Sequence, residues 1–311
     1  MANVLGIDTS NYTTSCALYM SDTGEVISLK KLLPVKEGER GIRQSDGVFH
    51  HVNQISPLMT ELLGDKNINI HAVCASTAPR PVEGSYMPVF TVGSCVAQTV
   101  SAALNVPFFE TSHQQGHIMA ALFSAGRMDL ISKPFIAFHV SGGTTEAILV
   151  TPSEKDIIKC EIIAETLDLN AGQLIDRIGV LMGLSFPCGK ALEELALKYT
   201  GKIKVKPVLK EQNCHLSGFE NKLSRMYEES SDKPMVSAYT LAYVEATISA
   251  MTERLLQKYG KLPVVFAGGV MSNSIIRDKL SKKFDSSFAK PEFSCDNAAG
   301  VAILGYFKSV G

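Results

Sequence analysis

Two strand-turn-strand segments that resemble each other, at residues 4–20 and 135–150, constrain the fold of this chain more than any other feature. In the first, the apolar run 4–8 (VLGID) leads through a Ser/Thr-rich turn into a returning strand, and a third strand is expected at 26–32. In the second, the apolar run 135–140 (FIAFHV) leads into Ser-Gly-Gly-Thr-Thr before the chain returns. Short apolar runs bounded by turn residues are typical of strands. The repetition predicts two duplicated α/β lobes that face each other across a cleft.

The chain is long enough for two such lobes. Its 311 residues are 45% hydrophobic and 20% charged, so each lobe can bury its own core. We expect residues 1–132 to form the first lobe and residues 133–297 the second, with a final helix at 298–311 that completes the first. Periodicity and cap residues predict further helices and strands, at 47–63, 72–77, 93–104, 234–259 and 262–267.

The first of these helices is expected to start after Asp46, which can act as its N-cap. His50 and His51 fall on or near it. For both histidines, a solvated or capping role is the simpler interpretation.

The net charge of −1 excludes a uniformly basic nucleic-acid-binding protein. Contact with RNA would have to come from a local patch. The longest basic stretch is 198–210 (KYTGKIKVKPVLK), which contains five lysines. A solvated loop face and a nucleic-acid-binding patch are both compatible with this stretch.

The seven cysteines are scattered and never form a C-x-x-C pair, which indicates reduced thiols rather than a disulfide framework or a zinc ribbon. No basic segment precedes the first strand, and no apolar run reaches about 18 residues. We therefore expect a cytoplasmic protein without an export signal or a membrane span.

The sharpest chemical signal is the histidine pair of residues 113–117 (HQQGH). If residues 112–124 form a helix, the spacing of four places His113 and His117 on one face, about one turn apart, where they can bind one metal ion. Histidines four residues apart also occur in helices by chance. The pair alone therefore leaves metal binding open.

Asp296 is a candidate third ligand, because it lies at a loop-to-helix junction in the segment SCDNAAG. Two histidines and one carboxylate make a facial triad with open coordination positions. Gln114 stands where the motif His-Glu-x-x-His has its general base, which disfavours a zinc peptidase. His139, at the end of a predicted strand, is either a satisfied core residue or a fourth ligand.

Glycine pairs that follow two buried strands predict a ligand site. Gly142 and Gly143 let the backbone approach a ligand and direct N–H groups at phosphate oxygens. The segment 268–273 (GGVMSN) can pack against a purine or a sugar, with Asn273 available to hydrogen-bond. Asp176 lies within a predicted helix, where a solvent-facing role and a functional role are both possible.

Six segments occur in the order found in one protein family: GIDTSNYTTSCAL, HQQGH, HVSGGTTEAIL, ETLDLNAGQLIDRIG with FPCGKALEELA, VVFAGGVMSN and CDNAAGVAILGY. The chain resembles the tRNA threonylcarbamoyltransferase family over nearly its whole length. This is the TsaD or Gcp-like group, formerly described as O-sialoglycoprotein endopeptidase, of the actin/Hsp70/sugar-kinase superfamily.

The resemblance implies an α/β, bilobal actin/Hsp70/sugar-kinase-like fold around a nucleotide cleft. It also implies an acyltransferase that moves a threonylcarbamoyl group from threonylcarbamoyl-adenylate to N6 of adenosine 37 of tRNA. A divalent metal ion, iron or zinc, and protein partners from the threonylcarbamoylation machinery are expected with it. By motif position, the metal ligands would be His113, His117 and Asp296, with His139 as a possible fourth, and no separate catalytic side chain is needed. The positions matching nucleotide contacts are His139, Val140, Ser141, Gly142, Gly143, Asp176, Gly189, Glu193 and Asn273.

Four segments depart from the family pattern. The usual Ala-x-x-x-Gly-Pro-Gly-Leu is TAPRPVEG at 77–84, and the usual Pro-Glu-x-Ala-Ser-Arg is QSDGVF at 44–49. Thr144 replaces a histidine, and SGFEN at 217–221 replaces Ser-Gly-x-Lys-Thr. A second interpretation is therefore a divergent nucleotide- and metal-binding paralogue, with a regulatory role or a different small-molecule carbamoyl- or phosphoryl-transfer activity.

Overall fold

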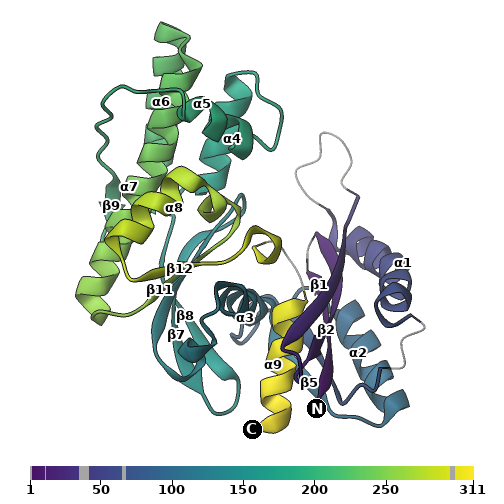
Figure 1. Ribbon diagram of the computed structural model, residues 1–311. Coiled ribbons are helices and arrows are strands. Elements are labelled where there is room, and N and C mark those ends of the chain that lie inside the picture. The colour runs from purple at the N-terminus through teal and green to yellow at the C-terminus, as the bar shows by residue number, and fades with distance from the viewer. Residues whose placement is uncertain (1, 11, 35–41, 65–67, 295–297) are drawn as a thin grey trace. The chain divides into compact units, whose positions relative to one another are not determined.

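The computed structural model describes residues 2–10, 12–34, 42–64, 68–294 and 298–311, and the chain forms two compact units (Figure 1). The first unit contains Met1–Ser132, Thr151–Cys160 and Glu292–Gly311, and the second contains Lys133–Val150 and Glu161–Pro291.

The first unit is built on a five-stranded sheet with the order β3-β2-β1-β4-β5. Its strands are β1 Asn3–Ser10, β2 Thr13–Met20, β3 Glu25–Leu32, β4 Ala72–Ala78 and β5 Phe108–Ser112. β1 pairs with β2 in antiparallel and with β4 in parallel orientation. Val4, Leu5 and Ile7 are all fully buried. β1 reads as a continuous apolar run because a central strand is covered on both faces.

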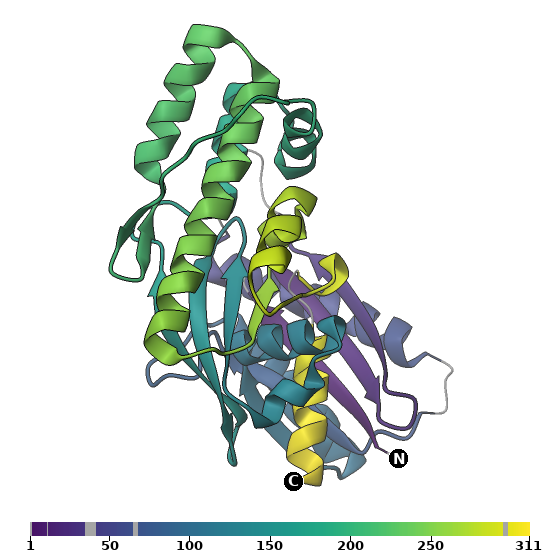
Figure 2. The same ribbon diagram turned by 60° about the vertical axis from the view of Figure 1, so that its left-hand side comes forward.

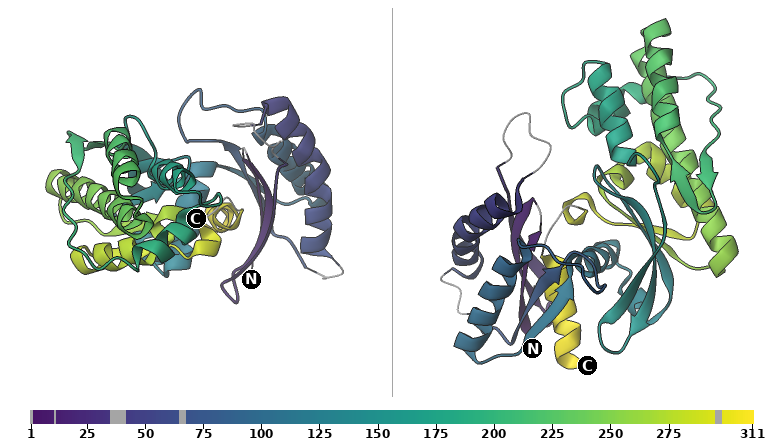
Figure 3. Two further views of the ribbon diagram at one scale, coloured as in Figure 1. Left: turned by 90° about the horizontal axis from the view of Figure 1, so that it is seen from above. Right: turned by 180° about the vertical axis from the view of Figure 1, so that it is seen from behind.

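Helices cover both faces of this sheet. α1 (Gln44–Leu63) and α2 (Phe90–Leu104) lie on one face, whereas α3 (His113–Ala125) and α9 (Ala299–Val310) lie on the other (Figure 3). α9 sits directly on β1, since a Cβ added to Gly6 would lie 2.5 Å from the Ala302 amide nitrogen. A glycine at this position is needed for so close an approach.

The second unit repeats this topology, with the strand order β12-β11-β6-β7-β8. β6 pairs with β7 in antiparallel and with β11 in parallel orientation, as β1 does with β2 and β4. The predicted α/β fold with two duplicated lobes is therefore confirmed. Its strands are β6 Phe135–Val140, β7 Thr145–Ser153, β8 Ile157–Glu165, β11 Val264–Ala267 and β12 Ser286–Phe288.

The long helix α7 (Lys233–Tyr259) packs along this second sheet (Figure 2). It contacts the four other helices of the unit and the short β9–β10 hairpin. These elements are α4 Ala171–Leu181, α5 Gly189–Ala196, α6 Ser217–Ser230, α8 Ser274–Lys283, β9 Val208–Lys210 and β10 Asn213–His215. At the centre of the core, the Tyr243 ring stacks on Phe219 with 3.7 Å between centroids.

The distal part of the β7–β8 hairpin, Thr151–Cys160, belongs to the first unit, although the sequence boundaries assigned it to the second. The contacts give the reason. Gln115 Nε2 of α3 donates to the Ile158 carbonyl oxygen at 2.8 Å, and Lys308 Nζ of α9 lies 3.6 Å from an Asp156 carboxylate oxygen.

Two expectations for α1 were wrong. The helix begins at Gln44, upstream of Asp46, so Asp46 lies in its first turn rather than at its cap. His51 is fully buried, and its Nδ1 lies 2.8 Å from Thr14 Oγ1 of β2. A helical histidine facing a sheet becomes a core residue when the strand beneath supplies a hydroxyl partner.

The six cysteines in the described part of the chain are all free thiols, as the sequence predicts. Within the same residues, no helix has the length and apolar composition that crossing a membrane requires.

Candidate functional site

The histidine pair lies at the start of α3 because local sequence starts the helix there. Ser112 Oγ accepts a hydrogen bond from the Gln115 amide at 3.2 Å, and the Ser112 amide donates to Gln115 Oε1 at 3.0 Å. This reciprocal arrangement is a capping box, which satisfies N–H groups that a helix start leaves unpaired. His113 is therefore the first helical residue, and His117 follows one turn later.

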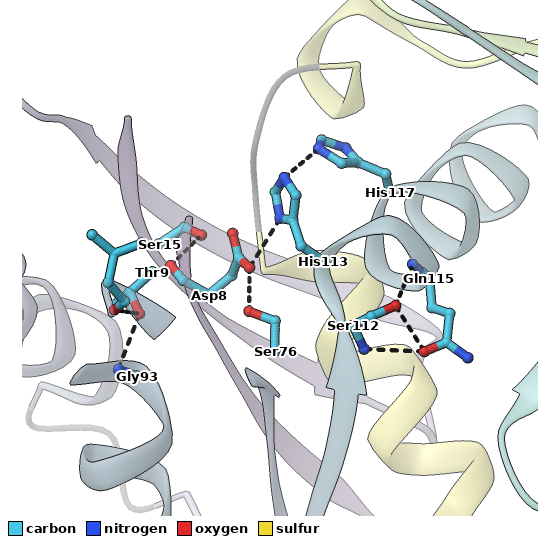
Figure 4. Close-up of polar contacts among 10 residues, drawn as sticks. Asp8, Thr9, Ser15, Ser76, Gly93, Ser112, His113, Gln115 and His117 are labelled. Carbon is cyan, nitrogen blue, oxygen red and sulfur yellow. Dashed lines mark hydrogen bonds and ion pairs between the residues drawn. The ribbon is translucent and has the colours of Figure 1, made fainter. Parts of the chain in front are cut away.

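The two imidazole rings meet edge-on through their nitrogen atoms, and Asp8 holds one of them (Figure 4). His113 Nδ1 lies 3.0 Å from Asp8 Oδ1, and the Nε2 atoms of His113 and His117 are 2.9 Å apart. Asp8, in β1, is fully buried and also accepts a hydrogen bond from the Ser76 hydroxyl of β4. The chain thus brings β1, β4 and α3 together around one carboxylate.

This arrangement suits a metal-binding histidine. When a carboxylate accepts the Nδ1–H of an imidazole, it fixes the tautomer and the ring orientation and leaves the Nε2 lone pair for another partner. Two nitrogens that each lie about 2.0 to 2.1 Å from one ion are about 2.9 Å apart when they subtend about 90° at it. The donor types and the facing Nε2 atoms therefore fit a shared metal ion.

Asp296, the expected third ligand, lies outside the described residues. Within those residues, no group of three or more His, Cys, Asp or Glu side chains could hold a metal ion. Ala299, three residues further along the chain, begins α9, and α9 packs on α3. A Cβ added to Gly300 would overlap the Gly116 carbonyl oxygen. The helix that follows Asp296 is thus in close backbone contact with the turn between the two histidines.

A second polar group, which the sequence did not predict, lies between β2 and α1. Thr14 Oγ1 bonds to His51 Nδ1 and to Gln54 Oε1, both at 2.8 Å. Burial lowers the pKa of His51, and this effect exceeds the opposite influences of Asp8 and of the Ser10 backbone. His51 is thus a buried core residue whose Nδ1 is held by the Thr14 hydroxyl.

The second unit contains a pocket of about 380 Å³. Five of the residues predicted to contact nucleotide line it: Gly142, Asp176, Gly189, Glu193 and Asn273. They come from four separate segments, namely the β6–β7 turn, α4, α5 and the start of α8. The other lining residues are Gly172, Ile175, Pro187, Lys190, Gly269, Val270 and Ser272.

Several of these polar side chains also hold the pocket wall in place. Asp176 Oδ1 accepts the Cys188 amide at 2.8 Å, which fixes the start of α5 to α4. Glu193 Oε1 accepts the Ser274 amide at 2.7 Å, which joins α5 to α8. Asn273 caps α8, because its Oδ1 accepts the Ile276 amide at 3.1 Å. Because the wall is braced from several elements, the pocket is largely formed without a ligand.

The sequence predicted that the N–H groups of the glycine turn 141–144 point at a ligand. In the structure, two of them point at a side chain of the turn itself. The Gly143 and Thr144 amides both lie within hydrogen-bond distance of Ser141 Oγ, at 3.3 and 3.2 Å. Gly172 of α4 presses on this turn, since an added Cβ would lie 2.6 Å from the Gly142 nitrogen. Of the turn, only Gly142 lines the pocket.

His139 and Val140 lie at the end of β6 and do not line the pocket either. Val140 is fully buried in the core. His139 is paired in the ladder with Glu146 of β7 and Ala267 of β11. His139 belongs to the second unit and the His113–His117 pair to the first, so its proposed role as a fourth ligand stays a prediction.

Lys190 is a pocket residue that sequence reasoning missed, although it directly follows Gly189. It adds a cation to a pocket that Asp176 and Glu193 also line. Cys188, one residue earlier, is an unsuitable nucleophile, because burial and then the nearby Asp176 carboxylate raise the pKa of its thiol. The pocket thus offers charged and polar groups that can bind a ligand.

Two five-stranded units of the same topology define the actin/Hsp70/sugar-kinase fold class. Solved structures agree: full-length HypF in its phosphate- and nucleotide-bound form aligns with a TM-score of 0.59 at 14% identity, covering 100% of this chain and 56% of that one. A ROK family glucokinase from Streptomyces griseus aligns with a TM-score of 0.56 at 11% identity, covering 98% of this chain and all of that one. At these identities the likeness concerns the fold alone.

The sequence narrows this class to one family. The profile described as "TsaD: tRNA N6-adenosine threonylcarbamoyltransferase" matches residues 35–303. A tRNA N6-adenosine threonylcarbamoyltransferase from Francisella philomiragia subsp. philomiragia is 27% identical over 324 aligned positions, covering 98% of this chain and 94% of that one. The chain belongs to the TsaD family of tRNA-modifying transferases.

Proposed function

We propose that this chain transfers a threonylcarbamoyl group from threonylcarbamoyl-adenylate to N6 of adenosine 37 of tRNA, with one divalent metal ion, iron or zinc, bound by His113, His117 and Asp296. The observation that carries the proposal is the pocket in the second unit. Residues from four segments, assigned to nucleotide contacts by their motifs alone, line one cavity there.

The pocket residues have the chemistry that the adenylate moiety needs. The Asp176 carboxylate can accept hydrogen bonds from ribose hydroxyls, and Asn273 can pair with a polar group of the base or the sugar. The ammonium of Lys190 can lie near a phosphate. Gly142 and Gly269 have no side chain, and among the described residues nothing beyond their chain neighbours lies within 4 Å of an added Cβ, so a ligand can approach the backbone closely there.

The transfer itself requires no protein nucleophile. The adenine N6 amine attacks the carbamoyl carbon of the adenylate, a C–N bond forms, the C–O bond to phosphate breaks, and AMP leaves with the bonding electron pair while N6 loses a proton. A bound metal ion would supply Lewis-acid polarisation of the carbonyl and a template for its orientation. Asp8 contributes by fixing the His113 ring, and the pocket residues by holding the leaving nucleotide.

The direct experiment is complementation. The chain is expressed in cells depleted of their own transferase, and threonylcarbamoyladenosine in total tRNA is measured by mass spectrometry. We expect the modification to return with the wild-type chain and not with His113→Ala/His117→Ala. Folded, stably expressed wild-type chain that restores no modification would contradict the proposal and favour the divergent paralogue with a regulatory or different transfer role.

The nucleotide pocket gives a prediction of its own. Asp176→Ala should weaken AMP binding by about 1.5 to 3 kcal/mol, the range for hydrogen bonds to a charged group. Isothermal titration calorimetry with metal-loaded protein measures this directly. Asn273→Ala removes a neutral contact and should cost less.

Because Asp176 also holds the Cys188 amide, Asp176→Asn serves as a second variant. It keeps an oxygen for that amide but loses the carboxylate charge, so AMP binding should weaken while thermal stability stays unchanged. Asp278→Ala is the matched control, since Asp278 lies on exposed α8 surface, paired with Lys282, and does not line the pocket. Equal AMP affinity in wild type and Asp176→Asn would place the ribose elsewhere.

A further inference from the structure

The basic stretch of residues 198–210 forms a row of lysines on the second unit. Between α5 and β9 the chain runs in an extended conformation beside α7 (Figures 1 and 3). Lys202, Lys204 and Lys206 are exposed, whereas the alternating Ile203 and Val205 pack against the core of the unit. Successive side chains of an extended chain point to opposite sides. The apolar residues therefore fix the segment and direct all three ammonium groups outward.

The backbone is held to α7 at Lys202, within the stretch, and at Glu211, directly after it. Tyr239 Oη lies 3.5 Å from the Lys202 carbonyl oxygen, and an Arg254 guanidinium nitrogen donates to the Glu211 carbonyl oxygen. These anchors are fifteen residues apart on α7, or about 22 Å at a rise of 1.5 Å per residue. The five lysines of the stretch, Lys198, Lys202, Lys204, Lys206 and Lys210, are here called the lysine ridge. Four of them lie between the two anchors, and Lys198 lies in the turn that follows α5.

The ridge concentrates positive charge on an otherwise acidic chain. Residues 198–210 contain five lysines and no acidic residue, a charge of +5, whereas the whole chain carries −1, so all other residues together carry −6. In the part of the chain that the structure describes, none of the five ammonium groups forms an ion pair. Two carboxylates of α7, Glu245 and Glu253, are instead paired with lysines of α8.

We propose that the lysine ridge binds the phosphate backbone of the tRNA substrate. The inference rests on the proposed transfer to tRNA, and it adds a surface that none of the motifs assigns. A row of ammonium groups without ion-pair partners is complementary in charge to the row of phosphates along a nucleic-acid strand. Contacts between ammonium groups and phosphates position a nucleic acid without reading its sequence. The ridge contains no planar donor or amide side chain that could recognise a particular base, so the family's modification of one adenosine must be specified elsewhere.

The test is the salt dependence of tRNA binding. Lys202→Ala/Lys204→Ala/Lys206→Ala is compared with Lys279→Ala/Lys282→Ala/Lys283→Ala, which removes the same charge from α8, where the lysines are ion-paired. Fluorescence anisotropy with unmodified tRNA, at salt concentrations from 50 to 200 mM, gives the slope of log K against log salt. Each phosphate contact contributes about 0.7 to 0.9 to this slope. The slope of the ridge variant should be smaller in magnitude than the wild-type slope by about 2 to 3, because three contacts are lost. The α8 variant should keep the wild-type slope.

The outcomes separate this inference from the transfer activity. The ridge variant should still bind AMP and metal like the wild type, because none of its substitutions lies in the pocket or at the histidine pair. Circular dichroism establishes that it is folded. An unchanged slope in the ridge variant, an equal loss in both triple variants, or a wild-type chain that does not bind tRNA would each overturn the proposal. The first two outcomes leave the assigned transfer reaction intact.

Discussion

Replacing His113 or His117 by alanine should abolish stoichiometric metal binding. Each imidazole supplies one of the two facing Nε2 atoms, and a site that keeps only one of them loses the chelation that makes a paired site strong. Protein loaded with Fe²⁺ or Zn²⁺, dialysed and analysed by elemental mass spectrometry should fall from about one ion per chain to nearly none. His71→Ala, at an exposed histidine that bonds to the Asn3 amide, is the control and should retain its metal.

Asp8→Asn should give an intermediate result in the same experiment. The variant keeps the size of the side chain but removes the charge that orients the His113 ring, and such orienting partners typically contribute about 10- to 100-fold to metal affinity. Competition with a chromophoric chelator measures the affinity. A His113→Ala/His117→Ala double variant that still binds one full equivalent would refute the metal site, and the 2.9 Å contact would then be an ordinary hydrogen bond between imidazoles.

Gly300→Ala should be the most destabilising of the small substitutions considered. The added methyl group would overlap the Gly116 carbonyl oxygen and lie 2.7 Å from the Ala120 amide nitrogen. Both neighbours are backbone atoms of α3, so one helix must move. Overpacking of this kind costs about 1 to 3 kcal/mol, and calorimetry should show Tm lowered by about 3 to 10 °C.

The same substitution should also weaken metal binding, because Gly116 lies in the turn between the two proposed histidine ligands. Gly218→Ala is the matched control. Gly218 lies in the first turn of α6. Apart from its own helix backbone and chain neighbours, no heavy atom of the described residues lies within 4 Å of an added Cβ, and alanine is the better helix former there. If the Tm of Gly300→Ala equals that of wild type, the α3–α9 contact has more room than the structure indicates.

The sequence by itself determined the elements whose cause is local. Ser112 and Gln115 form a capping box three residues apart, so the start of α3, and with it the spacing of the histidine pair, was predictable from neighbouring residues. The duplicated topology was likewise predictable, from the apolar runs of β1 and β6 and the turns that follow them. The family motifs added the predicted nucleotide contacts, of which Asp176, Glu193 and Asn273 line one pocket.

Only the tertiary structure decided which distant residues meet. Asp8 and His113 are 105 positions apart, and their contact depends on the parallel register of β1 and β4 and on the docking of α3 beside them. His51 became a core residue because Thr14 lies beneath it, which helical periodicity cannot reveal. Likewise, the alternation in residues 202–206 shows a period of two, but which side faces the core follows from α7, an element that begins more than 25 residues later. Caps and periodicity act between near neighbours in the chain, whereas these contacts depend on how separate elements pack.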